Sequence, residues 1–188
     1  MKKTLIILML IVLFVPSALM AQQRSLAGDA RFGFFVAPVL IVTSISDQVE
    51  TMAGVRGAVI LGGWFSIGIG AYTLISDFKV DVDGSMENLN FNFGGLEQDI
   101  IFLSDSLVHG VFRLLRGAGS ASLGDVVSAD RFFVGEIGGD AELNITNWMR
   151  LSVGGGWRMV QGVNDLEGLI NKDLSGLYAS VAIKVGMF

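Results

Sequence analysis

The residues of this chain that could do chemistry are acids and bases that alternate with apolar residues. Glu97 and Asp99, for example, alternate with Leu96 and Ile100. A period of two predicts β-strands with one apolar and one polar face. Ten charged residues fall on predicted polar faces: Arg56, Glu97, Asp99, Arg113, Glu136, Asp140, Glu142, Arg150, Arg158 and Lys184. Acids and bases are equal in number, so the set predicts a structural cluster of charges that neutralise one another.

Other candidate chemistry is weaker. Nucleophilic catalysis would need His109, the only histidine, beside an activated serine. His109 lies on a predicted polar face close to a tight turn, where we expect a hydrogen-bonded structural histidine. The segment Asp81-Val82-Asp83-Gly84 matches part of a calcium loop, but Lys79 and Asn90 occupy its first and last ligand positions. We therefore predict a solvated acidic loop there, with weak divalent-cation binding left open, and no catalytic residue, metal site or cofactor.

The N-terminus, Met1 to Ala21, predicts a secretory signal peptide. Two lysines precede an apolar run from Leu5 to Val15, which is too short to cross a bilayer as a helix. Cleavage leaves residues 22–188 as one domain and removes Lys2 and Lys3 but no acid, so the net charge goes from −5 to −7. The chain has no cysteine, which excludes both disulfides and a lipid-anchoring cysteine.

The composition is apolar but not helical. Mean hydropathy is +0.61, yet the most apolar mature segment, 32–42, has half of the ~20 residues that a membrane helix needs. The 25 glycines also disfavour helices. A transmembrane β-barrel resolves this conflict, because each of its strands needs only ~9–11 residues with one apolar face.

Eight strand-like segments are predicted: 30–43, 53–63, 66–76, 89–103, 107–117, 131–143, 149–161 and 176–188. Long acidic connections alternate with tight ones. The long ones are 44–52, 77–88, 118–130 and 162–175, and the tight ones lie near 64–65, 104–106 and 144–148. Outer-membrane barrels have short periplasmic turns and long external loops. The alternation therefore predicts that both termini are periplasmic, and the acidic loops argue against a nucleic-acid partner.

Aromatic residues and the ends of the strands add finer expectations. One aromatic belt is expected at the periplasmic rim and a second at the outer rim. Their members are Trp64, Phe65, Phe102, Trp148 and Phe188 for the first, and Phe132, Phe133 and Tyr178 for the second. Gly94-Gly95 is expected to form a bulge that switches faces, since Phe91 and Phe93 have the opposite parity to Leu96. A turn centred near Asp105 would place Glu97 opposite Arg113.

The chain resembles the small eight-stranded outer-membrane barrels, the group that contains the OmpA transmembrane domain and OmpX. The resemblance rests on patterns of strand and turn: Arg56-Gly57, Phe65-Ser66-Ile67-Gly68, Gly94-Gly95-Leu96-Glu97 and the closing Lys184-Val185-Gly186-Met187-Phe188. It implies an all-β, antiparallel, up-and-down barrel in the outer membrane, with the last strand closing against the first. It also implies contact with outer-membrane lipid and lipopolysaccharide, and recognition of the last strand by the barrel-assembly machinery. No catalytic residue is carried over.

Two functional readings follow. The first is a barrel with a side-chain-filled lumen that acts as a structural or surface-interaction protein through its acidic loops, because eight strands enclose a space just wide enough for side chains. The alternative is a narrow conduit for small apolar molecules, similar to OmpW-like barrels. A lipid-modifying barrel enzyme comes third, and we expect a protein that is not an enzyme. The external ligand is not indicated.

Overall fold

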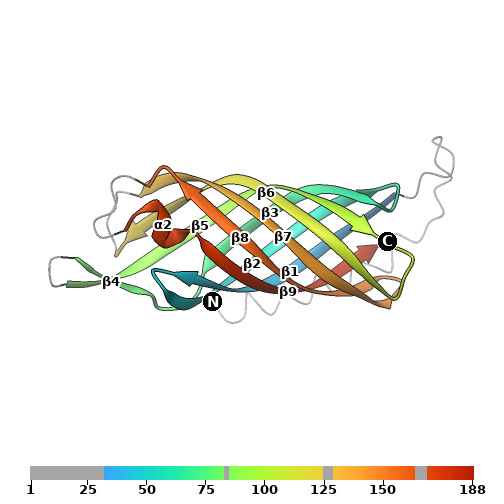
Figure 1. Cartoon of the computed structure of the whole chain (residues 1–188), viewed down its shortest axis with the longest axis horizontal. Helices are drawn as coiled ribbons and strands as arrows, with labels where there is room; N and C mark the ends of the chain where they lie inside the picture. Colours follow the sequence, from blue (N-terminus) through green and yellow to red (C-terminus); the bar gives the residue numbers. More distant parts are fainter. Residues whose placement is uncertain (1–31, 83–84, 125–128, 164–168) are drawn as a thin grey trace, which may run out of the picture. The chain divides into compact units, whose positions relative to one another are not determined.

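The computed structural model of the protein describes residues 32–82, 85–124, 129–163 and 169–188. The predicted signal peptide lies outside this part of the chain. The described residues are nearly all β-structure, as Figure 1 shows. The elements are β1 (Phe32–Ile45), β2 (Gln48–Leu61), β3 (Phe65–Leu74), β4 (Lys79–Val82), β5 (Ser85–Phe102), β6 (Val108–Leu123), β7 (Asp130–Thr146), β8 (Met149–Gln161), α2 (Asn171–Leu174) and β9 (Gly176–Met187).

The strands close into an antiparallel barrel. They pair in the order β3-β2-β1-β9-β8-β7-β6-β5-β4, and β3 also pairs with β5. The pairing of β1 with β9, from Phe34 opposite Met187 to Thr43 opposite Tyr178, is the predicted closure of the last strand on the first. The short β4 pairs only with the end of β5 that extends beyond β3, so eight of the nine strands form the barrel. The predicted fold class is confirmed.

The connections differ from the prediction at one end of the barrel. β1 and β2 continue to Ile45 and Gln48, so the predicted long loop 44–52 is a two-residue turn at Ser46 and Asp47. Both turn residues have positive φ, 48° and 62°, which suits the twist of a tight hairpin. The predicted loop 77–88 contains the hairpin of β4 and β5, and the loop 162–175 contains α2. The connections after β2, β5 and β7 are short, as predicted.

The barrel is apolar outside and charged inside. Along β1, exposed side chains alternate with buried ones from Phe32 to Thr43. Outward-facing residues on the other strands include Val55, Ile69, Ile100, Phe112, Ile137, Val153, Trp157 and Ile183, each at least 40 % exposed. An apolar exterior around a charged interior is stable only where lipid surrounds the protein, so this is a transmembrane barrel. No helix in the described part of the chain is long and apolar enough to cross a bilayer.

Several aromatic residues face inward, contrary to the sequence-based expectation. The pairing of β5 with β6 runs without a shift from Leu89 to Phe102, so Gly94-Gly95 forms no bulge. Phe91 and Phe93 therefore stay on the inward parity and are buried. Three residues assigned to the lipid-facing belts also face the interior or its mouth: Phe132, Tyr178 and Phe188. The first two are buried, and the ring of Phe188 stacks on the buried ring of Phe35 with centroids 6.4 Å apart. The inward position of these aromatic residues follows from the size of the lumen, because an eight-stranded barrel encloses a space that large side chains can fill.

The end of the barrel nearest β4 and α2 is closed by apolar side chains. The carbonyl of Asp173 in α2 accepts a hydrogen bond from the backbone N–H of Ser46 (2.9 Å). The hydroxyl of Ser175 accepts one from the backbone N–H of Val160 (2.9 Å). These bonds attach the α2 segment to β8 and to the β1–β2 turn, and Leu174 is fully buried. The other buried apolar residues at this end are Ile45, Met52, Phe78, Leu89, Leu123, Val163 and Leu169.

Candidate functional site

The barrel interior contains all ten charged residues that the sequence places on polar faces. Each is at most 8 % exposed, and Arg158 is completely buried. They come from β2, β5, β6, β7, β8 and β9. Isolated buried charges would be costly, so their arrangement in pairs decides whether the barrel is stable.

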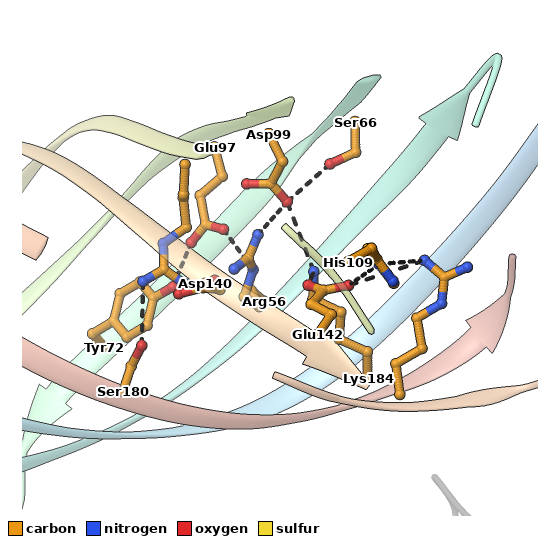
Figure 2. A network of polar contacts seen from close by, with 12 residues as sticks. Arg56, Ser66, Tyr72, Glu97, Asp99, His109, Asp140, Glu142, Ser180 and Lys184 are labelled. Atoms are coloured by element: carbon orange, nitrogen blue, oxygen red, sulfur yellow. Dashed lines mark hydrogen bonds and ion pairs between the residues drawn. The ribbon is translucent and has the colours of Figure 1, made fainter. Parts of the chain in front are cut away.

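Arg56 is at the centre of the first group of contacts (Figure 2). Its Nη2 donates a 2.6 Å hydrogen bond to Oδ2 of Asp99, and its Nε lies 2.7 Å from Oε2 of Glu97. Ser66 donates a further bond of 3.0 Å to Oδ2 of Asp99, and the hydroxyl of Tyr72 donates to Glu97. One guanidinium from β2 thus holds two carboxylates from β5, across the intervening strand β3. These bonds hold β2 and β5 at a fixed distance, although the two strands are not joined by backbone hydrogen bonds.

Glu142 is at the centre of the second group. Its carboxylate forms an ion pair with Lys184, and its Oε2 lies 3.2 Å from Nε2 of His109. Nη1 of Arg150 lies 3.4 Å from the same histidine nitrogen and 4.0 Å from Oε2 of Glu142. Nζ of Lys184 is also 3.9 Å from Oδ2 of Asp99. Lys184 therefore joins this group to the first one, as Figure 2 shows.

The remaining charges form two further pairs. Arg113 donates from Nη1 to Oδ2 of Asp140 (3.2 Å) and from Nη2 to the hydroxyl groups of Tyr178 (3.2 Å) and Ser180 (3.4 Å). Nε of Arg158 donates to Oε1 of Glu136 at 2.7 Å. The Arg158 guanidinium also lies 4.6 Å from the ring centroid of Phe93, within cation–π range. Aromatic rings and ion pairs thus fill the same part of the lumen.

The expected pairing of Glu97 with Arg113 is wrong. Leu115 lies opposite Glu97, and Asp99 lies opposite Arg113. The turn from Leu103 to Leu107, in which Leu103 has a φ of 59°, is centred one residue later than the predicted position. Moving the centre of a hairpin by one residue moves each partner by two, which keeps the faces correct but changes every pair.

Small residues on the inward parity make room for the charged ones. A Cβ added to Gly154 would clash with the Asp140 carboxylate. A Cβ added to Gly70 would clash with the Glu97 carboxylate and with the ring of Tyr72. Added at Gly156, it would meet the Tyr178 hydroxyl at 2.6 Å. The glycine run 154–156 within β8 therefore makes room for neighbouring groups in the lumen.

Sequence reasoning missed several polar members of the lumen, among them Ser66, Tyr72 and Tyr178. Ser66 and Tyr72 lie on β3, where alternation in the sequence is poor. Tyr178 shares the inward parity of Ser180 and Lys184 on β9, and that parity is the signal that could have placed it in the lumen instead of the outer aromatic belt. An outward charge was also missed, because Arg116 is exposed and donates a 2.8 Å bond to Oε1 of Gln98.

The chemistry available to these groups is limited by their burial. His109 is 3 % exposed, inside the barrel wall, and it contacts a carboxylate and a guanidinium. Within the described residues, no group of three or more histidine, cysteine or acidic side chains is arranged to hold a metal ion. The arrangement can pair charges and hold the walls together.

Comparison with solved structures shows the same fold. The chain is similar to Neisserial surface protein A, with a TM-score of 0.56 and 10% identity over 84% of this chain and 97% of that one. It is also similar to the N-terminal β-barrel domain of Pseudomonas aeruginosa OprF, with a TM-score of 0.55 and 10% identity over 81% of this chain and 97% of that one. No protein-family model and no curated protein sequence matches it.

Proposed function

We propose that this protein is an outer-membrane barrel with a plugged lumen, which acts as a membrane anchor for the surface formed by its β4 hairpin, its α2 segment and its loops. The observation that carries the proposal is the burial of the ten lumen charges. Side chains that line a water-filled channel stay accessible to water, whereas all ten are at most 8 % exposed. Their ion pairs connect β2 to β5 and β7 to β9, across the space that a channel would need.

The alternative of an apolar conduit has less support. A conduit would need a continuous apolar lining, and the ion pairs of Arg56 and Glu142 join strands of the described lumen that are not neighbours. Arg158, paired with Glu136 on the neighbouring strand, places a further buried charge in that lumen. Its apolar end is itself filled by buried side chains such as Phe91 and Leu174. Enzymatic activity is not part of the proposal, because His109 is buried inside the wall, away from lipid substrates.

Planar-bilayer recording of the refolded protein tests the plugged lumen. We expect no stable conductance steps, because the paired charges leave no continuous water path. A large porin reconstituted in the same bilayers is the positive control, and heat-modifiable migration on a gel establishes that the test protein is folded. Reproducible conductance steps from the folded barrel would contradict the proposal.

A further inference from the structure

A hollow of about 850 Å³ opens on the outer wall of the barrel, over β2, β3, β5, β6 and β7. We call it the outer hollow. Its floor is a row of small, outward-facing residues on paired strands: Val55 lies opposite Ala71, Ala71 opposite Gly94, and Gly94 opposite Ala118. Bulky Ile69 and Leu96 occupy the next row along β3 and β5. The hollow is thus a concave part of a surface that faces lipid.

A second row of the outer hollow is polar. Thr73 lies opposite Asn92, Asn92 opposite Ser120, and Ser120 opposite Arg131. Thr73 donates its hydroxyl to the side-chain carbonyl oxygen of Asn92, and both side chains are exposed on the outer face. Arg131 is the only charged residue that lines the hollow, it is exposed, and it forms no ion pair within the described residues. The polar side of the hollow therefore presents polar side chains and one cation that has no ion-pair partner among the described residues.

The direction of the rows relates the hollow to the membrane. Barrel strands tilt by about 35–45°, so a row of paired residues slopes relative to the membrane plane. At its β2 end the polar row continues through Ala53 to the exposed Leu40 on β1, within the apolar band. At its other end it stops at Arg131, close to the start of β7. The hollow thus runs from Arg131, near the end of the barrel, into the apolar band at Leu40. An acyl chain of a lipid extends in the same direction, from its headgroup into the bilayer.

We propose that the outer hollow binds one acyl chain of a phosphorylated glycolipid of the outer leaflet, with a phosphate group of that lipid at Arg131. The choice of leaflet rests on the orientation in the proposed function. Phosphate accepts charge-assisted hydrogen bonds from a guanidinium, and a lipid-facing cation is costly without such a partner. A second copy of the chain fits less well, because a two-fold interface brings hollow against hollow and leaves both unfilled.

Native mass spectrometry of the full-length mature protein, released from detergent with added lipid A, tests the proposal. We expect wild type to retain one lipid A, and Ala118→Leu, which fills the floor, to bind it about tenfold more weakly. Arg131→Gln removes the phosphate contact and should weaken lipid A binding by a similar factor. Phosphatidylcholine, which is zwitterionic, should be retained less than lipid A by wild type.

Two matched controls isolate the hollow. Ala179→Leu enlarges an exposed alanine on β9, and Lys172→Gln removes an exposed cation in α2; both should bind lipid A as wild type does. Equal retention by wild type, Ala118→Leu and Arg131→Gln would overturn the proposal, as would a preference for phosphatidylcholine. A dimer that Ala118→Leu abolishes would overturn it in favour of a second copy. None of these outcomes affects the conductance test, so the plugged barrel can stand when the lipid site fails.

Discussion

At the scale of single residues, the barrel depends on how buried charges are shared. Arg56 binds both Asp99 and Glu97, so Arg56→Met leaves two carboxylates without their main partner. We expect a loss of about 3–5 kcal/mol in unfolding free energy. Asp99→Asn should also destabilise the barrel, and the double variant should lose less than the sum of the two. Urea titrations in lipid vesicles over this double-mutant cycle measure the coupling.

The control cycle pairs Arg56→Met with Glu136→Gln. Glu136 forms its ion pair with Arg158, whereas Arg56 forms its ion pairs with Glu97 and Asp99, so the two residues share no ion-pair partner within the described chain. The two losses should add within about 0.5 kcal/mol. If the losses of unfolding free energy for Arg56→Met and Asp99→Asn were additive, the 2.6 Å contact between the two side chains would contribute no coupling energy.

At the scale of elements, the β1–β2 turn holds two residues in a backbone conformation that glycine adopts more easily. Asp47 has a φ of 62° and an exposed side chain. Asp47→Gly removes a left-handed penalty of about 1 kcal/mol, so we expect the variant to unfold at a higher urea concentration. Asp105→Gly, in a turn where only Leu103 has positive φ, should give no gain. Equal effects at the two sites would mean that φ at position 47 is not limiting.

At the scale of the whole molecule, the two ends of the barrel should face different compartments. Epitope tags after Gly124, next to β6 and at the end that carries β4 and α2, should be labelled by antibody on intact cells. Tags at Asp105, at the opposite end, should be labelled only after permeabilisation. Figure 1 shows the C-terminus at that opposite end. The reverse labelling pattern would invert the orientation and place the outer hollow in the inner leaflet.

The sequence by itself determined the class of protein and the side of each strand that faces inward. Alternation placed Arg56, Asp99 and Glu142 on polar faces, and all three are buried inside the barrel. A period of two is a local property, because successive side chains of a strand point to opposite faces whatever the strand pairs with. Closure of β9 on β1 also followed, since a lipid-exposed strand edge is not tolerated.

Only the tertiary structure decided which charges meet. The centre of the β5–β6 turn sets every partner on the two strands, and a one-residue change there replaced Glu97 with Asp99 opposite Arg113. Contacts across the lumen, such as Arg56 with Asp99 and Lys184 with Glu142, join strands that are not neighbours. Their partners depend on how the barrel closes and how much room the glycines leave, and neither is encoded in the alternation of a single strand.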